Sequence, residues 1–256
     1  MILAVDVGNT NIVLGCVDQE KIHWSERVST IITKTEAEYA IDIKMMLDIN
    51  HVDIRKLDGA IVSCVVPQIQ NVIRKAIEMI LNKKVLVIGP GVKTGLNIKI
   101  DDPGSLGADI VADSVAAMTY NKFPIAVVDM GTATTITVIN KKKEYIGGLI
   151  LPGVMVSLDA LASNAAQLYA ISIDRPKKLI ATTASESMLS GILYSNASAI
   201  DGILDRIEEE LGEKPAVVAT GGLTKRIIPL CRHEIVIDDN LLLKGLWIIY
   251  NKNRKN

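Results

Sequence analysis

The chain has 256 residues, and its 28 basic and 29 acidic side chains leave a net charge of −1. Because no basic surplus is available to neutralise a phosphate backbone, this balance argues against a nucleic-acid-binding protein. No run of about 18 apolar residues is present and the N-terminus has no basic leader, so we expect neither a membrane span nor a signal peptide. The three widely spaced cysteines favour a reducing, cytoplasmic compartment over a disulfide framework or a zinc site.

Short apolar runs alternate with helical patterns along the whole chain. We predict strands at residues 2–5, 12–17, 59–63, 85–88, 125–128, 135–139, 216–219 and 234–237, and helices at 35–50, 67–83, 105–121, 157–169, 185–211 and 241–251. Thr35 and Glu38 form a capping-box pattern at the first helix, and Pro67 suits the first turn of the second. The alternation predicts an α/β fold.

An internal repeat relates the two halves of the chain. The sequences ILAVDVGNTN at residues 2–11 and AVVDMGTATT at 126–135 both read as an apolar strand that ends in Asp, followed by Gly and hydroxyl residues. The two aspartates, Asp6 and Asp129, stand 123 residues apart, close to half the chain. We therefore predict two similarly built domains, at residues 1–116 and 117–256.

Each copy of the repeat carries residues that suit a phosphate. Gly8 is expected to permit a tight turn with positive φ, so that backbone N–H groups and the polar side chains of residues 9–11 face a phosphate. A carboxylate repels a phosphate, so Asp6 is expected to act through a divalent cation or its bound water. An ordinary hairpin explains one such turn equally well, but two copies after equivalent strands favour phosphate binding.

Three glycine motifs lie outside the repeat. Residues 89–95 lack the spacing of a P-loop and predict a plain loop. Gly221 and Gly222 follow a strand, and they indicate either close approach to a nucleobase or ribose or a tightly packed turn. Gly107 and Ala108 leave space for a ligand, while Asp109 is either a partner of the helix dipole or a functional carboxylate.

Taken in order, these motifs resemble the type III pantothenate kinases, in the superfamily of actin, sugar kinases and seventy-kilodalton heat-shock chaperones. DMGTATT at residues 129–135, VIGPGVKTGLN at 87–97 and LKGL at 243–246 also match, so the resemblance covers nearly the whole chain. It implies two ribonuclease-H-like domains with mixed five-stranded sheets flanked by helices, and a homodimer. The implied activity is ATP-dependent phosphorylation of pantothenate to 4′-phosphopantothenate, the first step of coenzyme A biosynthesis.

The resemblance also implies residue roles. Asp109 would be the general base on the acceptor hydroxyl, Asp6 would help to bind Mg²⁺, and Asp129 would coordinate K⁺ or NH₄⁺. The residues implied in ATP binding are Asp6, Val7, Gly8, Asn9, Thr10, Asn11, Ile12, Val13, Thr132, Gly221 and Gly222. Those implied in acceptor binding are Ile100, Gly107, Ala108, Asp109, Ile110, Asn164, Thr183 and Ala184.

Departures from the family pattern cluster at the acceptor residues. Ile100, Ile110, Asn164 and Ala184 stand where the family usually has Tyr, Arg, Arg and Thr. Loss of two arginines matters for a carboxylate substrate, since bidentate Arg–carboxylate pairs are the strong ones. Thr183 offers a replacement hydroxyl for Ala184.

Two alternatives to a pantothenate kinase therefore stay open. One is a related kinase that acts on a less anionic hydroxyl compound, and the other is a nucleotide-binding regulator without catalytic activity. The retention of Asp6, Asp109 and Asp129 argues against the regulator.

Overall fold

In the computed structural model, which describes residues 1–120, 122–164 and 171–254, the N-terminal apolar run is the central strand of a five-stranded sheet. The order of this sheet is β3-β2-β1-β4-β5. Strand β1 pairs antiparallel with β2 and parallel with β4. The strands are β1 (Ile2–Val7), β2 (Asn11–Val17), β3 (Ile22–Ser29), β4 (Ala60–Cys64) and β5 (Val85–Val87).

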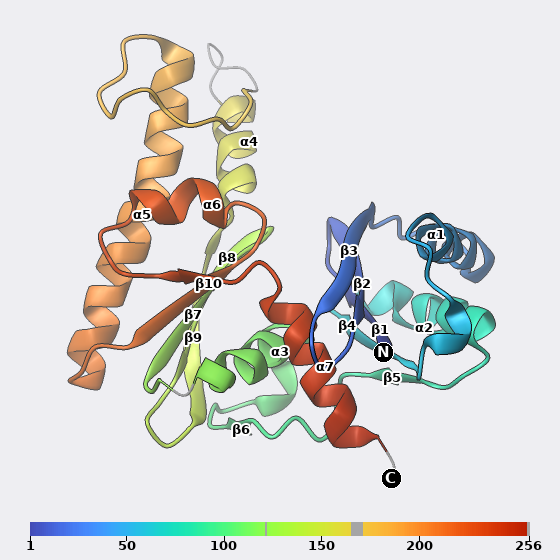
Figure 1. The fold of residues 1–256 in the computed structure, drawn as a ribbon. Coiled ribbons are helices and arrows are strands. Elements are labelled where there is room, and N and C mark those ends of the chain that lie inside the picture. Colours follow the sequence, from blue (N-terminus) through green and yellow to red (C-terminus); the bar gives the residue numbers. More distant parts are fainter. Residues whose placement is uncertain (121, 165–170, 255–256) are drawn as a thin grey trace. The chain divides into compact units, whose positions relative to one another are not determined.

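Helices cover both faces of this sheet (Figure 1). Helices α1 (Glu36–Ile49) and α2 (Pro67–Leu81) pack on one face, and α3 (Ala108–Ala117) and α7 (Leu241–Asn253) pack on the other. Because strand side chains alternate, Leu3, Val5 and Val7 join the apolar core under α1 and α2. Asp6 consequently points to the face of α3 and α7. The predicted capping box at Thr35 and Glu38 is confirmed.

The second sheet repeats the first and adds one strand. Its order is β11-β10-β7-β8-β9-β6, in which β7 pairs antiparallel with β8 and parallel with β10. Its strands are β6 (Asn97–Ile98), β7 (Ile125–Met130), β8 (Ala133–Ile139), β9 (Glu144–Pro152), β10 (Ala216–Thr220) and β11 (Val236–Ile237). The internal repeat is therefore real at the level of topology. The expectation of five strands holds for the first sheet, while the second has a sixth at its edge.

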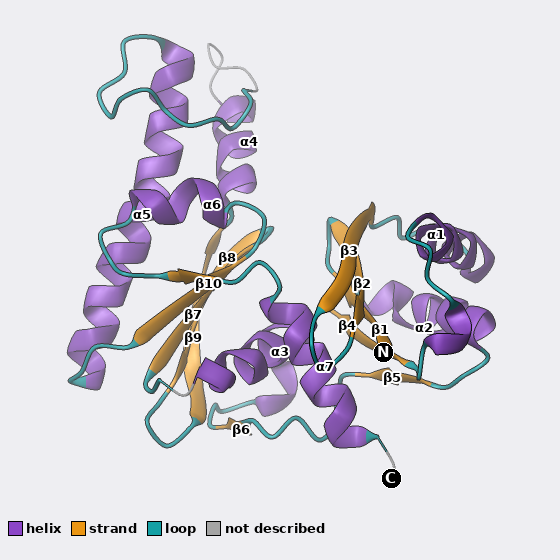
Figure 2. Cartoon of the chain, viewed as in Figure 1, coloured by secondary structure: helices purple, strands orange, loops and turns teal. Residues whose placement is uncertain are grey.

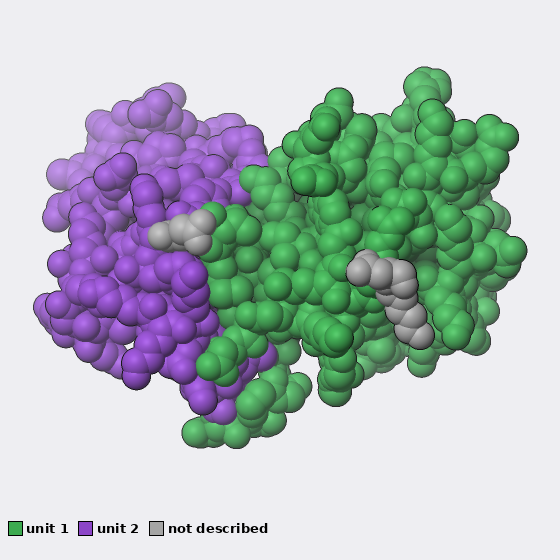
Figure 3. Space-filling model, turned by 60° about the horizontal axis from the view of Figure 1, so that its bottom comes forward, with its two compact units in different colours: residues 1–97, 101–119, 240–256 green, residues 98–100, 120–239 purple. Residues whose placement is uncertain are grey.

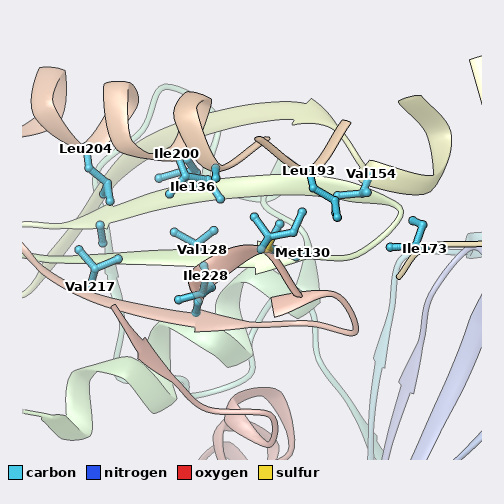
Figure 4. Close-up of a cluster of buried hydrophobic side chains, with 14 of the residues drawn as sticks. Val128, Met130, Ile136, Val154, Ile173, Leu193, Ile200, Leu204, Val217 and Ile228 are labelled. Carbon is cyan, nitrogen blue, oxygen red and sulfur yellow. The ribbon is translucent and has the colours of Figure 1, made fainter. Parts of the chain in front are cut away.

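The second sheet packs its core against helices α4 (Val154–Asn164), α5 (Ala184–Leu211) and α6 (Thr224–Ile227). Figure 4 shows Val128, Met130 and Ile136 of the sheet directed toward Leu193 and Ile200 of α5. Short 3-10 turns occur at Ile54–Lys56, Pro103–Ser105, Met118–Tyr120 and Ile228–Leu230. Helices, strands and loops are distinguished in Figure 2.

The chain divides into two compact units, which are coloured separately in Figure 3. Unit 1 comprises Met1–Asn97, Asp101–Thr119 and Asn240–Asn256, and unit 2 comprises Ile98–Ile100 and Tyr120–Asp239. The predicted boundary after residue 116 assigns α7 to the second domain, whereas α7 packs on α3, β1 and β4 of unit 1. None of the described helices combines the length and the apolar character that a membrane crossing requires.

The predicted helices agree with the observed ones to within a few residues at most ends. The helix predicted at 105–121 begins later, at Ala108, because Pro103–Ser105 forms a 3-10 turn. The helix predicted at 157–169 is seen as Val154–Asn164, and its residues 165–169 lie outside the described part of the chain.

Candidate functional site

One group of candidate site residues is built on two parallel strands of unit 1. Asp6 at the end of β1 is in register with Ser63 of β4, and both point to the face covered by α3 and α7. Ser63 is fully buried. The Oδ1 atom of Asp6 is buried without a hydrogen-bond partner. Such burial of a carboxylate oxygen is unfavourable in free energy unless a ligand or cation binds to it.

The hairpin after Asp6 differs from the expectation in one respect. The prediction of positive φ at Gly8 is wrong, because Gly8 is absent from the positive-φ glycines of the described chain. A Cβ on Gly8 would instead lie 3.1 Å from the carbonyl oxygen of Asn11, and the Gly8 N–H donates to that oxygen at 3.0 Å. A side chain at position 8 would therefore require the Asn11 carbonyl to shift by a few tenths of an ångström.

Thr30, at the end of β3, supports this turn and was not anticipated from the sequence. Its Oγ1 donates to the Gly8 carbonyl at 2.7 Å, and its N–H donates to the Thr10 carbonyl at 3.0 Å. The side chains of Asn9, Thr10 and Asn11 are left exposed at the tip of the hairpin. The tip is thus a braced backbone loop that carries three exposed polar residues.

Asp109 lies in the first turn of α3, where the helix dipole favours a carboxylate. A Cβ on Gly107 would lie 2.4 Å from Oδ1 of Asp109, so the glycine leaves the space that this carboxylate fills. The same Oδ1 accepts the N–H of Ile110 at 2.7 Å. Both features fix the direction of the Asp109 side chain.

The two carboxylates of unit 1 influence each other. Burial raises the pKa of Asp6 to about 7, the Ser63 hydroxyl opposes that rise, and the charge of Asp109 adds to it. Burial also raises the pKa of Asp109, against the opposing effect of the Ile110 N–H. Pairs of acids with raised pKa values are typical of functional sites.

Unit 2 carries its own group of candidate site residues. Asp129 at the end of β7 is in register with Thr220 of β10, as Asp6 is with Ser63. In the following hairpin, the Gly131 N–H donates to the Ala133 carbonyl at 3.0 Å, so this turn is one residue tighter than the first. Thr132 is exposed at its tip.

Gly153 supports the second hairpin. Its N–H donates to the Thr132 carbonyl at 3.1 Å, and a Cβ there would lie only 2.1 Å from that oxygen. Gly221 has φ +104°, and its Cβ would lie 2.6 Å from the Met130 carbonyl. Gly221 therefore packs tightly against Met130, and its contact with a nucleobase or ribose stays a prediction.

The predicted acceptor residues fall in both units. Ala108 and Ile110 lie on α3 in unit 1, beside Gly107, whereas the other four lie in unit 2: Ile100, Asn164, Thr183 and Ala184. The Asn164 amide donates to the Ala160 carbonyl of its own helix at 2.8 Å. Thr183 is the N-cap of α5 and accepts the Glu186 N–H at 3.3 Å, so its hydroxyl already has a structural role.

Two observations limit the candidate sites. A surface hollow of about 380 Å³ lies between α5 and the segment before β11, lined by Asp201, Asp205, Lys214, Arg232 and His233, and it contains none of the predicted site residues. Within residues 1–120, 122–164 and 171–254, no group of three or more His, Cys, Asp or Glu side chains is arranged to hold a metal ion alone.

Comparison with known proteins identifies the family. The family model described as type III pantothenate kinase matches residues 2–206. The chain is 43% identical to a type III pantothenate kinase of Halalkalibacterium halodurans over 255 residues, which are 99% of this chain and 100% of that protein. It is 42% identical to the type III pantothenate kinase of Bacillus cytotoxicus, covering 99% of this chain and 97% of the relative.

Solved structures show the same fold at much lower identity. Component A of (R)-2-hydroxyglutaryl-CoA dehydratase from Acidaminococcus fermentans matches with a TM-score of 0.56 and 14% identity over 97% of this chain and 96% of its own. A putative N-acetylmannosamine kinase from Listeria monocytogenes matches with a TM-score of 0.56 and 12% identity over 99% of both chains. These likenesses confirm the predicted α/β fold.

Proposed function

Because the chain belongs to the type III pantothenate kinase family and phosphorylates pantothenate with ATP in coenzyme A biosynthesis, we propose that Asp109 accepts the proton of the pantothenate hydroxyl. The observation that carries this role is the placement of Asp109: a partly buried carboxylate in the first turn of α3, with the space for it left by Gly107. The cytoplasm remains the predicted location of the reaction.

Phosphoryl transfer needs positioning and charge stabilisation more than covalent chemistry. Burial raises the pKa of Asp109, which makes its carboxylate a better proton acceptor than an exposed aspartate. The bond from the Ile110 N–H to Oδ1 holds the carboxylate in one direction. An oriented, moderately basic carboxylate suits removal of the hydroxyl proton as the phosphoryl group is transferred.

The hairpin tips supply the contacts to ATP in this proposal. Residues 9–11 present exposed Asn, Thr and Asn side chains on a turn that Thr30 braces through two hydrogen bonds. Gly153 braces the Thr132 turn through one backbone hydrogen bond. Short polar side chains on fixed turns suit phosphate oxygens, since they donate hydrogen bonds without adding negative charge.

The residues present fit the implied cations to different degrees. Asp6 fits Mg²⁺, because its buried Oδ1 has no hydrogen-bond partner and Mg²⁺ binds one or two carboxylates together with substrate phosphates. When bound, Mg²⁺ neutralises charge on the phosphates. Asp129 would supply a single carboxylate to K⁺ or NH₄⁺. One carboxylate does not select for either cation, so the assignment of Asp129 rests on the family resemblance.

A homodimer is the proposed assembly. Large apolar side chains lie exposed on β9, on α4 and in the segment before α5, and they include Leu149, Ile150, Met155, Val156, Leu179 and Ile180. Ile150 is 77% exposed and Ile180 is 83% exposed. Apolar surface of this extent is typical of a protein interface, and a two-fold axis would pair the patch with its own copy.

The acceptor residues indicate weak binding of the pantothenate carboxylate. Position 110 holds Ile, Asn164 donates to its own helix, and the Thr183 hydroxyl caps α5. These positions therefore provide no guanidinium for a bidentate pair with a carboxylate. We infer that the enzyme has a high KM for pantothenate, and that a less anionic hydroxyl compound is the second candidate substrate.

Replacement of Asp109 tests the proposed role. Asp109→Asn keeps the size of the side chain and removes the proton acceptor, so kcat should fall by about 10²-fold or more while the KM for ATP stays within a few-fold. Asp48→Asn, an exposed carboxylate on α1, is the matched control and should keep full turnover. Near-full turnover by Asp109→Asn would remove Asp109 from the mechanism.

A further inference from the structure

Helices α3 and α7 of unit 1 lie side by side with their backbones in contact (Figure 1). The contact is made possible by Gly245 in the LKGL segment of α7. A Cβ on Gly245 would lie 1.9 Å from the carbonyl oxygen of Ala112, 2.5 Å from its carbonyl carbon and 3.0 Å from its Cα. All three are backbone atoms of α3, so no side-chain rotation can relieve the contact.

The opposite side of α7 is fitted to the sheet just as closely. A Cβ on Gly15 of β2 would lie 2.8 Å from Cδ1 of Leu243, and a Cβ on Gly59 would lie 2.4 Å from the Tyr250 hydroxyl. Leu243 and Leu246 are buried. Helix α7 therefore cannot shift toward the sheet. A larger side chain at position 245 must consequently displace α3.

The C-terminal end of α7 is also held. The Asn253 side chain accepts the Lys93 N–H at 3.0 Å and donates to the Lys93 carbonyl at 2.9 Å. This pair of bonds joins the end of the helix to the loop at residues 89–96. Helix α7 is thus fixed along its length, and it forms a rigid support against which α3 rests.

Ala112 lies one helical turn after Asp109, and a helix transmits a displacement of one turn to the next. We propose that Gly245 is a positioning residue: by letting α3 rest directly on α7, it sets the place of the Asp109 carboxylate relative to Asp6. This inference rests on the proposed role of Asp109. It gives the LKGL segment, which contains none of the predicted site residues, a function in catalysis.

The size of the effect follows from the contact distances. Lengthening the 1.9 Å contact to an ordinary carbon–oxygen separation of about 3.5 Å requires α3 and α7 to separate by roughly 1.6 Å along its direction. A misplacement of about 1 Å at a reacting group can cost on the order of 10²-fold in rate. Gly245→Ala should therefore lower kcat by about 10- to 100-fold. The KM for ATP should stay within about 3-fold, because the hairpin at residues 8–11 is braced by Thr30 rather than by α7.

A double-mutant cycle with Asp109→Asn tests whether Gly245 acts through Asp109. If it does, Gly245→Ala should cost less than about 3-fold in kcat once Asp109 is already Asn, because the group that it positions is gone. A role in general stability would lower kcat by the same factor in both backgrounds. The assay is steady-state ADP release with pantothenate, on variants whose circular dichroism shows that they are folded at the assay temperature.

The matched control is Gly202→Ala, a glycine within α5 whose Cβ would meet only the flexible Arg206 guanidinium at 3.3 Å; its kcat should stay within 2-fold of the parent. If Gly245→Ala does not fold, Gly15→Ala replaces it in the cycle, since it presses on α7 through the mobile tip of Leu243 and should show a milder effect of the same kind.

An equal loss in both backgrounds, or full turnover by a folded Gly245→Ala protein, would overturn the inference. Near-full turnover by Asp109→Asn alone would instead overturn the proposed role of Asp109. The cycle therefore separates failure of this inference from failure of the mechanism on which it rests.

Discussion

Replacement of Asp6 by Asn should make the ligand-free protein more stable at pH 8. It should also remove part of the pH dependence of the free energy of unfolding. Asp6 lies at the end of β1 as a partly buried residue, and its Oδ1 is fully buried without a hydrogen-bond partner. Burial raises its pKa from the ordinary 3.8 to about 7. The side chain of Asn has nearly the same shape and carries no charge, so the variant isolates the effect of ionising this group.

The sign and the magnitude follow from linkage. The native state holds the Asp6 proton more tightly than the unfolded chain does, so the resulting stabilisation is fully present below a pH of about 4 and is lost as the pH rises through about 7. With one pKa unit equal to about 1.4 kcal/mol, the loss between pH 5 and pH 8 is roughly 2–3 kcal/mol in the free energy of unfolding.

Urea unfolding in EDTA, at intervals from pH 5 to pH 8, measures this difference. The free energy of unfolding of Asp6→Asn minus that of the wild type should grow by about 2–3 kcal/mol across the range. Ser63→Ala removes the hydroxyl that opposes the rise in the Asp6 pKa, so it should move the midpoint of the wild-type change to higher pH. A difference that stays constant from pH 5 to pH 8 would refute the assignment of a raised pKa to Asp6.

Two further predictions concern the acceptor and the assembly. Restoring two guanidiniums with Ile110→Arg and Asn164→Arg should lower the KM for pantothenate by about 10-fold or more, since a charge-assisted hydrogen bond contributes about 1.5–3 kcal/mol; an unchanged KM for pantothenate would show that its carboxylate binds elsewhere. In sedimentation velocity at micromolar concentration we expect a dimer, and we expect Ile150→Glu to dissociate it. Ile49→Glu, at an equally apolar exposed position on α1 of unit 1, is the control and should leave the dimer intact. Dissociation by both variants or by neither would count against an interface formed by the exposed apolar residues of unit 2.

Strong, buried patterns allowed most of the fold to be predicted from the sequence. The amphipathic helices and the central strands were found because their apolar residues face a core. Strands β3 and β9 were missed because both are largely exposed and carry polar residues or adjacent glycines, as in IHWSERVS and EYIGGLILP. Such strands form because a hairpin aligns them with a buried neighbour, which local sequence does not reveal.

The sequence predicted the candidate site residues better than it predicted the residues that hold them in place. The repeat located Asp6 and Asp129, but the brace from Thr30 and the buried Ser63 beside Asp6 depend on strand register. A hydroxyl within the apolar run AIVSC is the one signal that could have pointed to Ser63. The close contact between Gly245 and Ala112 joins residues 133 positions apart, and packing of that kind cannot be derived from either segment alone.

The measurement that tests the central claim most directly is ADP release by the purified chain with Mg-ATP and K⁺, with and without pantothenate. The account predicts that ADP release depends on pantothenate, that phosphorus NMR detects one new phosphomonoester in equal amount, and that Asp109→Asn slows the reaction by about 10²-fold. Mg-ATP binding without any pantothenate-dependent ADP release, even at high pantothenate concentration, would contradict it.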